Sequence, residues 1–259
     1  KEKWGVSAWK TYTQYGPGGR GYFMTDDVGV RFVEKARALG VKVICIHKGL
    51  PFGRQSYEHS QCSDIGPIAR RFPDVKFLIY HSGFVSSVAE QPYDPDAKRD
   101  GIDTLVRSLV ESGVKPGSNV YAELGSTWRF LMREPEQAAH AMGKLLKYCG
   151  KDNVVWGTDS IWYGSPQDQI QAFRAFQIAP ALRAKHGYPE ITPALRAKIF
   201  GLNGARVYGL SAAEVKKYAS RDAVASEKAV YQEKPGPSFL TYGPKTKREF
   251  LSLLKRGGA

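Results

Sequence analysis

The stretch Val41-Lys42-Val43-Ile44-Cys45-Ile46-His47 is an almost wholly apolar, β-branched run that ends abruptly in a polar residue. Such a run is typical of a strand that is buried on both faces of a parallel sheet. Similar runs recur, and the polar residues that end them are spaced 34 to 42 residues apart: Lys10, His47, His81, Glu123 and Asp159. Helical patterns fill the intervals, and this alternation predicts a (β/α) barrel with its chemistry at the strand ends.

Residues between the runs carry the usual end signals of helices. Thr25 precedes an acidic first turn, Gly40 ends the same pattern, and Ser211 forms a capping box with Glu214. From about Arg221 onward the polar, proline-containing chain predicts an irregular tail. We expect strands at 5–10, 41–46, 75–80, 119–122 and 154–158, and helices at 25–39, 63–72, 100–111, 135–149, 165–177, 192–200 and 202–208.

The number of predicted strands is five, whereas a closed barrel of this type has about eight. Five parallel strands leave an open edge with unpaired backbone groups. The fold class predicted is therefore α/β, a partial TIM-type (β/α) barrel over residues 1–210. We expect a C-terminal helical and irregular extension over 211–259, and about three further strand–helix units before Lys1.

Composition limits the classes of partner. The 38 Lys and Arg residues exceed the 25 Asp and Glu residues, which gives a formal net charge of +13, but only the tail from Lys245 to Arg256 clusters them. We therefore expect no nucleic-acid partner. No apolar stretch approaches the roughly 20 residues of a membrane span, so no membrane partner is expected. Cys45, Cys62 and Cys149 are interpreted as buried thiols, while the compartment (cytoplasmic or exported) and homo-oligomer formation stay open.

Side chains at the strand ends of a (β/α) barrel converge at one mouth, although they lie far apart in the sequence. The five polar residues that end the runs would therefore form one cluster. Imidazole and carboxylate groups together are typical ligands of a divalent transition metal, most often zinc. The sequence thus predicts a metal site with a small-molecule substrate, in which Asp159 and His81 are the candidate proton-transfer groups.

Four segments resemble the amidohydrolase-related branch of the amidohydrolase superfamily, which also includes the aminocarboxymuconate-semialdehyde decarboxylase-like enzymes. The resemblance covers about residues 1 to 210 and rests on Val43–His47, on the segment from Asp64 to Gly83, on Trp156-Gly157-Thr158-Asp159-Ser160, and on residues 199–209. The His-x-His pair that ends the first strand in this family is absent from the sequence. If the chain is the whole protein, His47 and Asp159 supply only two ligands.

This resemblance implies roles for individual residues. His47 matches the metal-binding His after the fifth strand and Asp159 the metal-binding Asp after the eighth. His81 matches the His after the sixth strand, which is an acid–base or substrate-polarising group in single-metal members and a ligand of the second ion in two-metal members. Lys10 is either a bridging carboxylated lysine or a substrate-side lysine, and Glu123 is a hydrogen-bonding support rather than a ligand.

Three further residues are candidates for the substrate side of the site. Arg54 and Lys48 would hold a carboxylate of the substrate. Trp162 would form an apolar wall of the pocket or pack its own loop. The expected function is metal-dependent hydrolysis of a C–N or C–O bond of a small molecule. The alternatives are a non-oxidative decarboxylase and a catalytically incomplete fragment.

Overall fold

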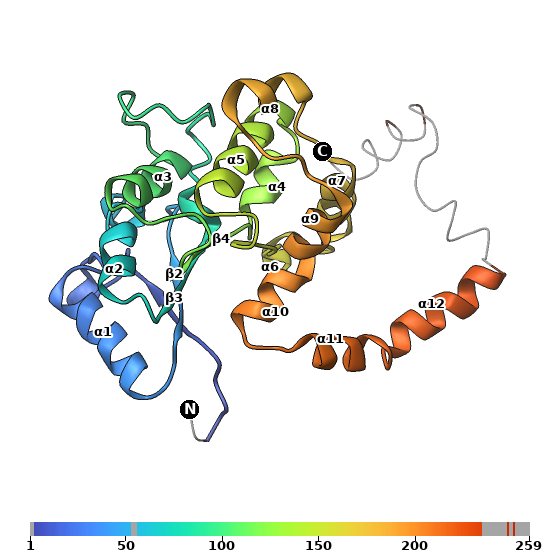
Figure 1. Ribbon diagram of the computed structural model, residues 1–259, viewed down its shortest axis with the longest axis horizontal. Helices are drawn as coiled ribbons and strands as arrows, with labels where there is room; N and C mark the ends of the chain where they lie inside the picture. Colours follow the sequence, from blue (N-terminus) through green and yellow to red (C-terminus); the bar gives the residue numbers. More distant parts are fainter. Residues whose placement is uncertain (1–2, 53–55, 235–247, 249–250, 252–259) are drawn as a thin grey trace. The chain divides into compact units, whose positions relative to one another are not determined.

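Five parallel strands form a single sheet in the computed structural model, which describes residues 3–52, 56–234, 248 and 251. The strands follow one another in space in their chain order (Figure 1). Their bounds are β1 Trp9–Tyr12, β2 Val43–His47, β3 Lys76–Tyr80, β4 Val120–Glu123 and β5 Val154–Val155. The predicted α/β fold with five parallel strands is confirmed.

Two strand ends differ from the prediction. Lys10 was expected to end the first strand, but it lies inside β1, which continues to Tyr12. Its Cα is paired in register with that of Cys45, one layer below His47. β5 contains only two residues, so Asp159 is separated from the strand by a short loop and precedes helix α6 instead.

Helices occupy the intervals between the strands. Asp26 rather than Thr25 precedes the first helix, and α4, α6 and α8 were not predicted. The expectation of an irregular tail from Arg221 is wrong over part of its length, because residues 223–233 form a helix that begins at an Asp222 cap. The helices are α1 Asp27–Ala38, α2 Ile65–Arg71, α3 Ile102–Glu111, α4 Thr127–Leu131, α5 Pro135–Tyr148, α6 Ser160–Tyr163, α7 Gln167–Ala175, α8 Pro180–His186, α9 Pro193–Ala197, α10 Asn203–Val207, α11 Ala212–Ala219 and α12 Ala223–Glu233, with a π-helical turn at Lys198–Leu202.

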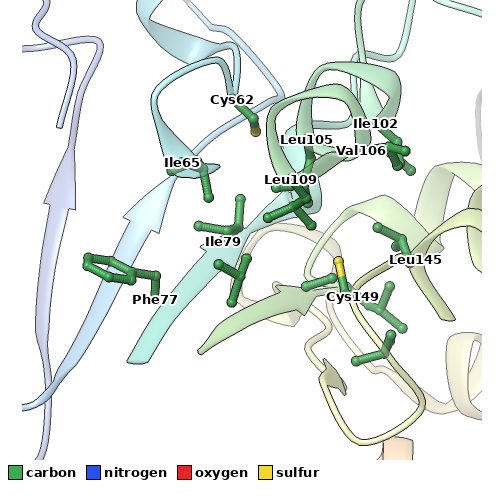
Figure 2. Packing of buried hydrophobic residues seen from close by; sticks show 14 of the residues in the cluster. Cys62, Ile65, Phe77, Ile79, Ile102, Leu105, Val106, Leu109, Leu145 and Cys149 are labelled. Carbon is green, nitrogen blue, oxygen red and sulfur yellow. The ribbon is translucent and has the colours of Figure 1, made fainter. Parts of the chain in front are cut away.

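One face of the sheet carries the main core. Alternate strand residues such as Ile46, Phe77, Ile79 and Ala122 pack in one cluster with the apolar faces of α1, α2, α3 and α5. Figure 2 shows part of this packing, with labelled side chains from the segment before α2, from α3 and from the end of α5 grouped beside β3. Cys62 and Cys149 belong to this cluster, and all three cysteines are buried free thiols, as predicted.

The other face of the sheet, called the inner face below, carries a second and smaller cluster. Here Cys45, Leu78 and Tyr121 form a smaller cluster with Val207 of α10. Lys76 Nζ donates hydrogen bonds to the carbonyl oxygens of residues 206 and 207, and Tyr208 Oη lies 3.8 Å from Cys45 Sγ. The segment that follows the last strand therefore covers part of this inner face.

The chain divides into two compact units, residues 1–209 and residues 210–259. The first contains the sheet and helices α1 to α10, and the second contains α11 and α12. The capping box predicted at Ser211 and Glu214 is present at the start of α11. Among the described residues, no helix has the length and apolar character that crossing a membrane requires.

Candidate active site

The carboxyl ends of β2, β3 and β4 bring three of the predicted residues together. His47 ends β2, His81 directly follows β3, and Glu123 ends β4, and all three are buried. His81 Nε2 lies 3.3 Å from His47 Nδ1, and His81 Nδ1 lies 3.8 Å from Asp159 Oδ2. The two imidazoles and the carboxylate of Asp159 therefore form one contiguous cluster.

Aromatic rings enclose His47. Its ring stacks on Tyr12 with a centroid separation of 4.9 Å, and Phe52 meets it edge-on at 5.5 Å. Burial, together with the nearby His81 and Lys10, lowers the pKa of His47 to about 3. Burial also lowers the pKa of His81. Both imidazoles are therefore neutral near pH 7.

The hydrogen bonds then define which nitrogen of each neutral ring carries its proton. His81 Nδ1 lies 2.6 Å from the carbonyl oxygen of Gly125, which can only accept, so His81 carries its proton there. His81 Nε2 is then an acceptor, and His47 Nδ1 donates to it. His47 Nε2 then carries the lone pair, and by hydrogen-bond geometry this buried atom has no partner in the described part of the chain, although the backbone of Gly49 and Leu50 lies close enough to the ring to act against the lowering of its pKa.

Glu123 supports the turn that carries His81. Its carboxylate accepts the backbone N–H of His81 at 3.2 Å and that of Gly125 at 2.7 Å. His81 and Ser82 both have left-handed φ angles, 65° and 53°, which side-chain-bearing residues adopt only when neighbouring contacts hold them. Burial raises the pKa of Glu123 to about 7 despite these two donors.

Asp159 is held by a residue that the sequence did not reveal. Ser126 Oγ donates to Asp159 Oδ2 at 2.7 Å, and Tyr163 Oη donates to Ser126 Oγ at 3.1 Å. Ser126 and Asp159 both have φ angles of 54°, so two strained loop residues meet at this hydrogen bond. Ser126 follows the end of β4 by three residues, which is the one sequence signal that could have indicated it.

The remaining predicted residues lie in different surroundings. Lys10 is exposed on the inner face of the sheet, with Nζ 3.9 Å from the ring centroid of Tyr80. Lys48 is fully buried, and its ammonium group forms an ion pair of 2.9 Å with Asp64. Lys48 was expected to bind a carboxylate of the substrate, but Asp64 already fills that role. Trp162 is 77% exposed, and Arg54 lies outside the described residues. Substrate contact by Lys10, Trp162 and Arg54 stays a prediction.

The site provides some, but not all, of the protein ligands that a metal ion needs. A buried, neutral His47 with a free Nε2 lone pair is in the form that binds metals, and the side chain of Asp159 is 33% exposed and open to a ligand. Both ring nitrogens of His81 are engaged in hydrogen bonds. Over residues 3–52 and 56–234, no three His, Cys, Asp or Glu side chains are arranged to hold a metal ion. The structure thus offers two donors, one fewer than catalytic zinc sites use.

Comparison with known proteins assigns the chain to a family. The family model described as "Amidohydrolase" matches residues 5–210. The chain belongs to the amidohydrolase family. The family resemblance predicted from the sequence motifs is confirmed, and the match ends where the first compact unit ends.

One solved structure in the comparison is 2,6-dihydroxybenzoate decarboxylase complexed with 2,6-dihydroxybenzoate. It is 15% identical in sequence, the TM-score is 0.43, and the similarity covers 78% of this chain and 61% of that one. The amidohydrolase chain described here therefore spans less than two thirds of the length of that structure. The search of curated proteins found no match.

Proposed function

We propose that this amidohydrolase is a metal-dependent hydrolase that cleaves a C–N or C–O bond of a small molecule. The observation that carries the proposal is the buried Nε2 of His47, which has no hydrogen-bond partner among the described residues and belongs to a ring in contact with His81, which in turn lies near Asp159. An unsatisfied buried nitrogen costs free energy, about 1 to 3 kcal/mol, unless a ligand completes it. A metal ion at His47 Nε2 would remove that cost.

His47 and Asp159 would hold the metal ion, most simply zinc, and a further protein donor would complete the set. When bound, the ion supplies Lewis acidity that makes water a nucleophile near neutral pH. The Asp159 carboxylate, whose Oδ2 is oriented by the hydrogen bond from Ser126, would accept the proton of a water molecule at the site. Because Asp159 is partly exposed, a substrate can approach it from solvent.

His81 would act beside Asp159. Its Nδ1 lies 3.8 Å from Asp159 Oδ2, so a small movement brings the two groups into hydrogen-bond distance. The Nδ1–H of His81 could thereby donate a hydrogen bond that stabilises negative charge developing on the substrate. Glu123 fixes the backbone on both sides of this contact, because it binds the N–H groups of His81 and Gly125.

Zinc retention and product analysis test the proposal. The purified chain is dialysed with equimolar zinc, and bound metal is measured beside turnover of a panel of amides, esters and carboxylic acids. We expect zinc retention with release of amine or alcohol. His47→Ala and Asp159→Ala should lose the metal, whereas His81→Ala should keep it and lose about 10²- to 10⁴-fold in kcat, the usual worth of a general acid or base.

His59→Ala is the matched control, since His59 lies in the following segment and contacts Ser56 rather than the strand-end cluster. Its metal content and turnover should equal those of the unchanged protein. Release of CO2 from a carboxylic acid without hydrolysis would assign decarboxylation in place of hydrolysis. Failure of the unchanged chain to retain zinc, or retention of both zinc and turnover by His47→Ala, would contradict the metal assignment.

A further inference from the structure

A cavity of about 370 Å³ lies between the end of α5, the end of α8 and the segment at residues 92–93, and it shares no lining residue with the strand-end site. Its basic lining residues are Lys147, Lys185 and His186. Tyrosines supply most of the remaining wall, and none of the residues that line it is acidic. The volume suits a small organic ligand, because ligand pockets begin at about 300 Å³.

Positive charge gathers at this cavity without a balancing carboxylate. Lys147 Nζ donates to the carbonyl oxygen of His186 at 2.8 Å, which holds the ammonium group against the wall. The side chain of Lys185 makes no hydrogen bond or ion pair with any residue of the described ranges. Lys185 and Lys147 both contribute, after burial, to lowering the pKa of His186. The positive charge at the cavity is therefore that of the two lysines, and a bound anion would interact favourably with both.

The carboxylates beneath the cavity are already neutralised. Glu90 and Asp103 each lie 2.5 Å from the buried ammonium group of Lys144, and Asp103 also pairs with Arg99 at 3.1 Å. These acids therefore cannot serve as partners for Lys185.

Aromatic rings provide flat walls beside the cations. Tyr93 and Tyr148 meet edge to face with a centroid separation of 5.4 Å, and the rings of His186 and Tyr188 are 5.3 Å apart. Rings of this kind bind a planar ligand by stacking or edge contacts. A second cavity of about 680 Å³ shares Lys185 and His186 with the first, and its lining also includes Glu90, Glu134 and Glu136.

We propose that this cavity binds a small phosphate ester that carries a planar ring, such as a nucleoside monophosphate. Lys185 and Lys147 would contact the phosphate oxygens with charge-assisted hydrogen bonds. Tyr148 and Tyr93 would contact the ring. The site is independent of the metal donors, because His47, His81 and Asp159 do not line it.

Isothermal titration calorimetry with adenosine monophosphate tests the site, using the full chain in EDTA at pH 7. EDTA removes metal ions, so phosphate binding through a metal at the strand-end site does not contribute. We expect measurable binding that weakens about 10-fold in Lys185→Gln, the usual worth of one hydrogen bond to a charged group. Tyr148→Ala should weaken binding of adenosine monophosphate more than binding of inorganic phosphate.

Lys115→Gln is the matched control, because it removes the same charge from an exposed lysine that does not line this cavity. It should bind adenosine monophosphate as the unchanged chain does, and circular dichroism melting should show that each variant is folded. Three results would each overturn the proposal: no binding at millimolar ligand, equal losses in Lys115→Gln and Lys185→Gln, or adenosine binding as tightly as its monophosphate.

Discussion

His47 and His81 stay neutral because both rings are buried and their close neighbours include the cation of Lys10. The sequence placed both residues at strand ends, but the direction of the hydrogen bonds depends on Gly125, whose carbonyl oxygen accepts from His81. No sequence pattern indicates that the carbonyl group of Gly125 lies next to the His81 ring. The free lone pair at His47 Nε2 is therefore a property that only the three-dimensional arrangement shows.

The first prediction concerns Glu123 and the pH dependence of stability. The folded chain keeps a proton on Glu123 up to about pH 7, whereas an ordinary Glu loses it near 4.5, so this residue lowers stability as pH rises through that window. His47 acts in the opposite direction: its pKa of about 3 means that stability is lost as pH falls below 6.5. The two effects oppose each other between pH 4.5 and 6.5.

Glu123→Gln removes one of these opposing contributions. In EDTA, the free energy of unfolding of this variant should rise more steeply with pH than that of the unchanged chain, by about 1 kcal/mol per pH unit between pH 5 and 6.5. Urea unfolding at several pH values measures the slope. Glu111→Gln, at an exposed position at the end of α3, is the control and should leave it unchanged. Equal slopes for Glu123→Gln and the control would contradict the buried, protonated Glu123.

A second prediction at this scale concerns Ser126. Ser126→Ala removes the hydrogen bond that orients Asp159 Oδ2, and a lost partner of a ligating carboxylate typically costs 10- to 100-fold in metal affinity. We expect a loss of this size in zinc affinity by calorimetry, with partial recovery in Ser126→Thr, which keeps a hydroxyl group. Ser220→Ala, on the surface at the end of α11, should have no effect. Full zinc affinity in Ser126→Ala would show that Asp159 needs no such support.

At the scale of elements, the strands were predictable because β2 and β3 are short apolar runs that are buried on both faces. β5 was predicted too long because its hydrogen-bonded pairing with β4 ends at Val155, after which the chain turns toward Ile199. α12 was missed because its polar sequence lacks an apolar stripe, and none of its residues is buried. This helix is stabilised by the helical propensity of its residues and by the Asp222 cap, and not by packing against a core.

Packing between α3 and α5 leads to the third prediction. Lys144 of α5 is buried with Glu90 and Asp103, and no sequence pattern indicated this group. Lys144→Met leaves the two carboxylates buried without their cation, so it should lower the free energy of unfolding by about 3 to 5 kcal/mol in urea titrations. Lys151→Met, at an exposed position, should change it by less than about 0.5 kcal/mol. Equal free energies of unfolding of the two variants would mean that the buried ion pairs of Lys144 contribute nothing to stability.

At the scale of the whole molecule, the sheet has one face covered by helices and one inner face that the segment after β5 covers in part. The sequence predicted the first face from alternating strands and helices. It could not predict the second, because the cluster there brings Val207 together with strand residues that are far from it in the chain. The family match to residues 5–210 includes this closing segment.

The fourth prediction tests that closing contact. Val207 is 1% exposed within the inner cluster, and Val207→Ala removes two buried methyl groups. We expect a loss of about 2 kcal/mol in the free energy of unfolding, measured by urea titration. Val224→Ala on α12 removes the same groups from a side chain that is 76% exposed and should cost far less. Equal losses would mean that α10 does not close the inner face.

The central claim is that His47 offers a free, unprotonated Nε2 to a metal ion. Nitrogen-15 NMR of histidine-labelled protein measures this directly, with spectra recorded in EDTA and after addition of zinc. The account predicts that His47 is protonated at Nδ1 alone in EDTA, and that zinc shifts the His47 Nε2 signal while the His81 signals keep their pattern. A proton on His47 Nε2 in EDTA, or no shift of that signal with saturating zinc, would contradict it.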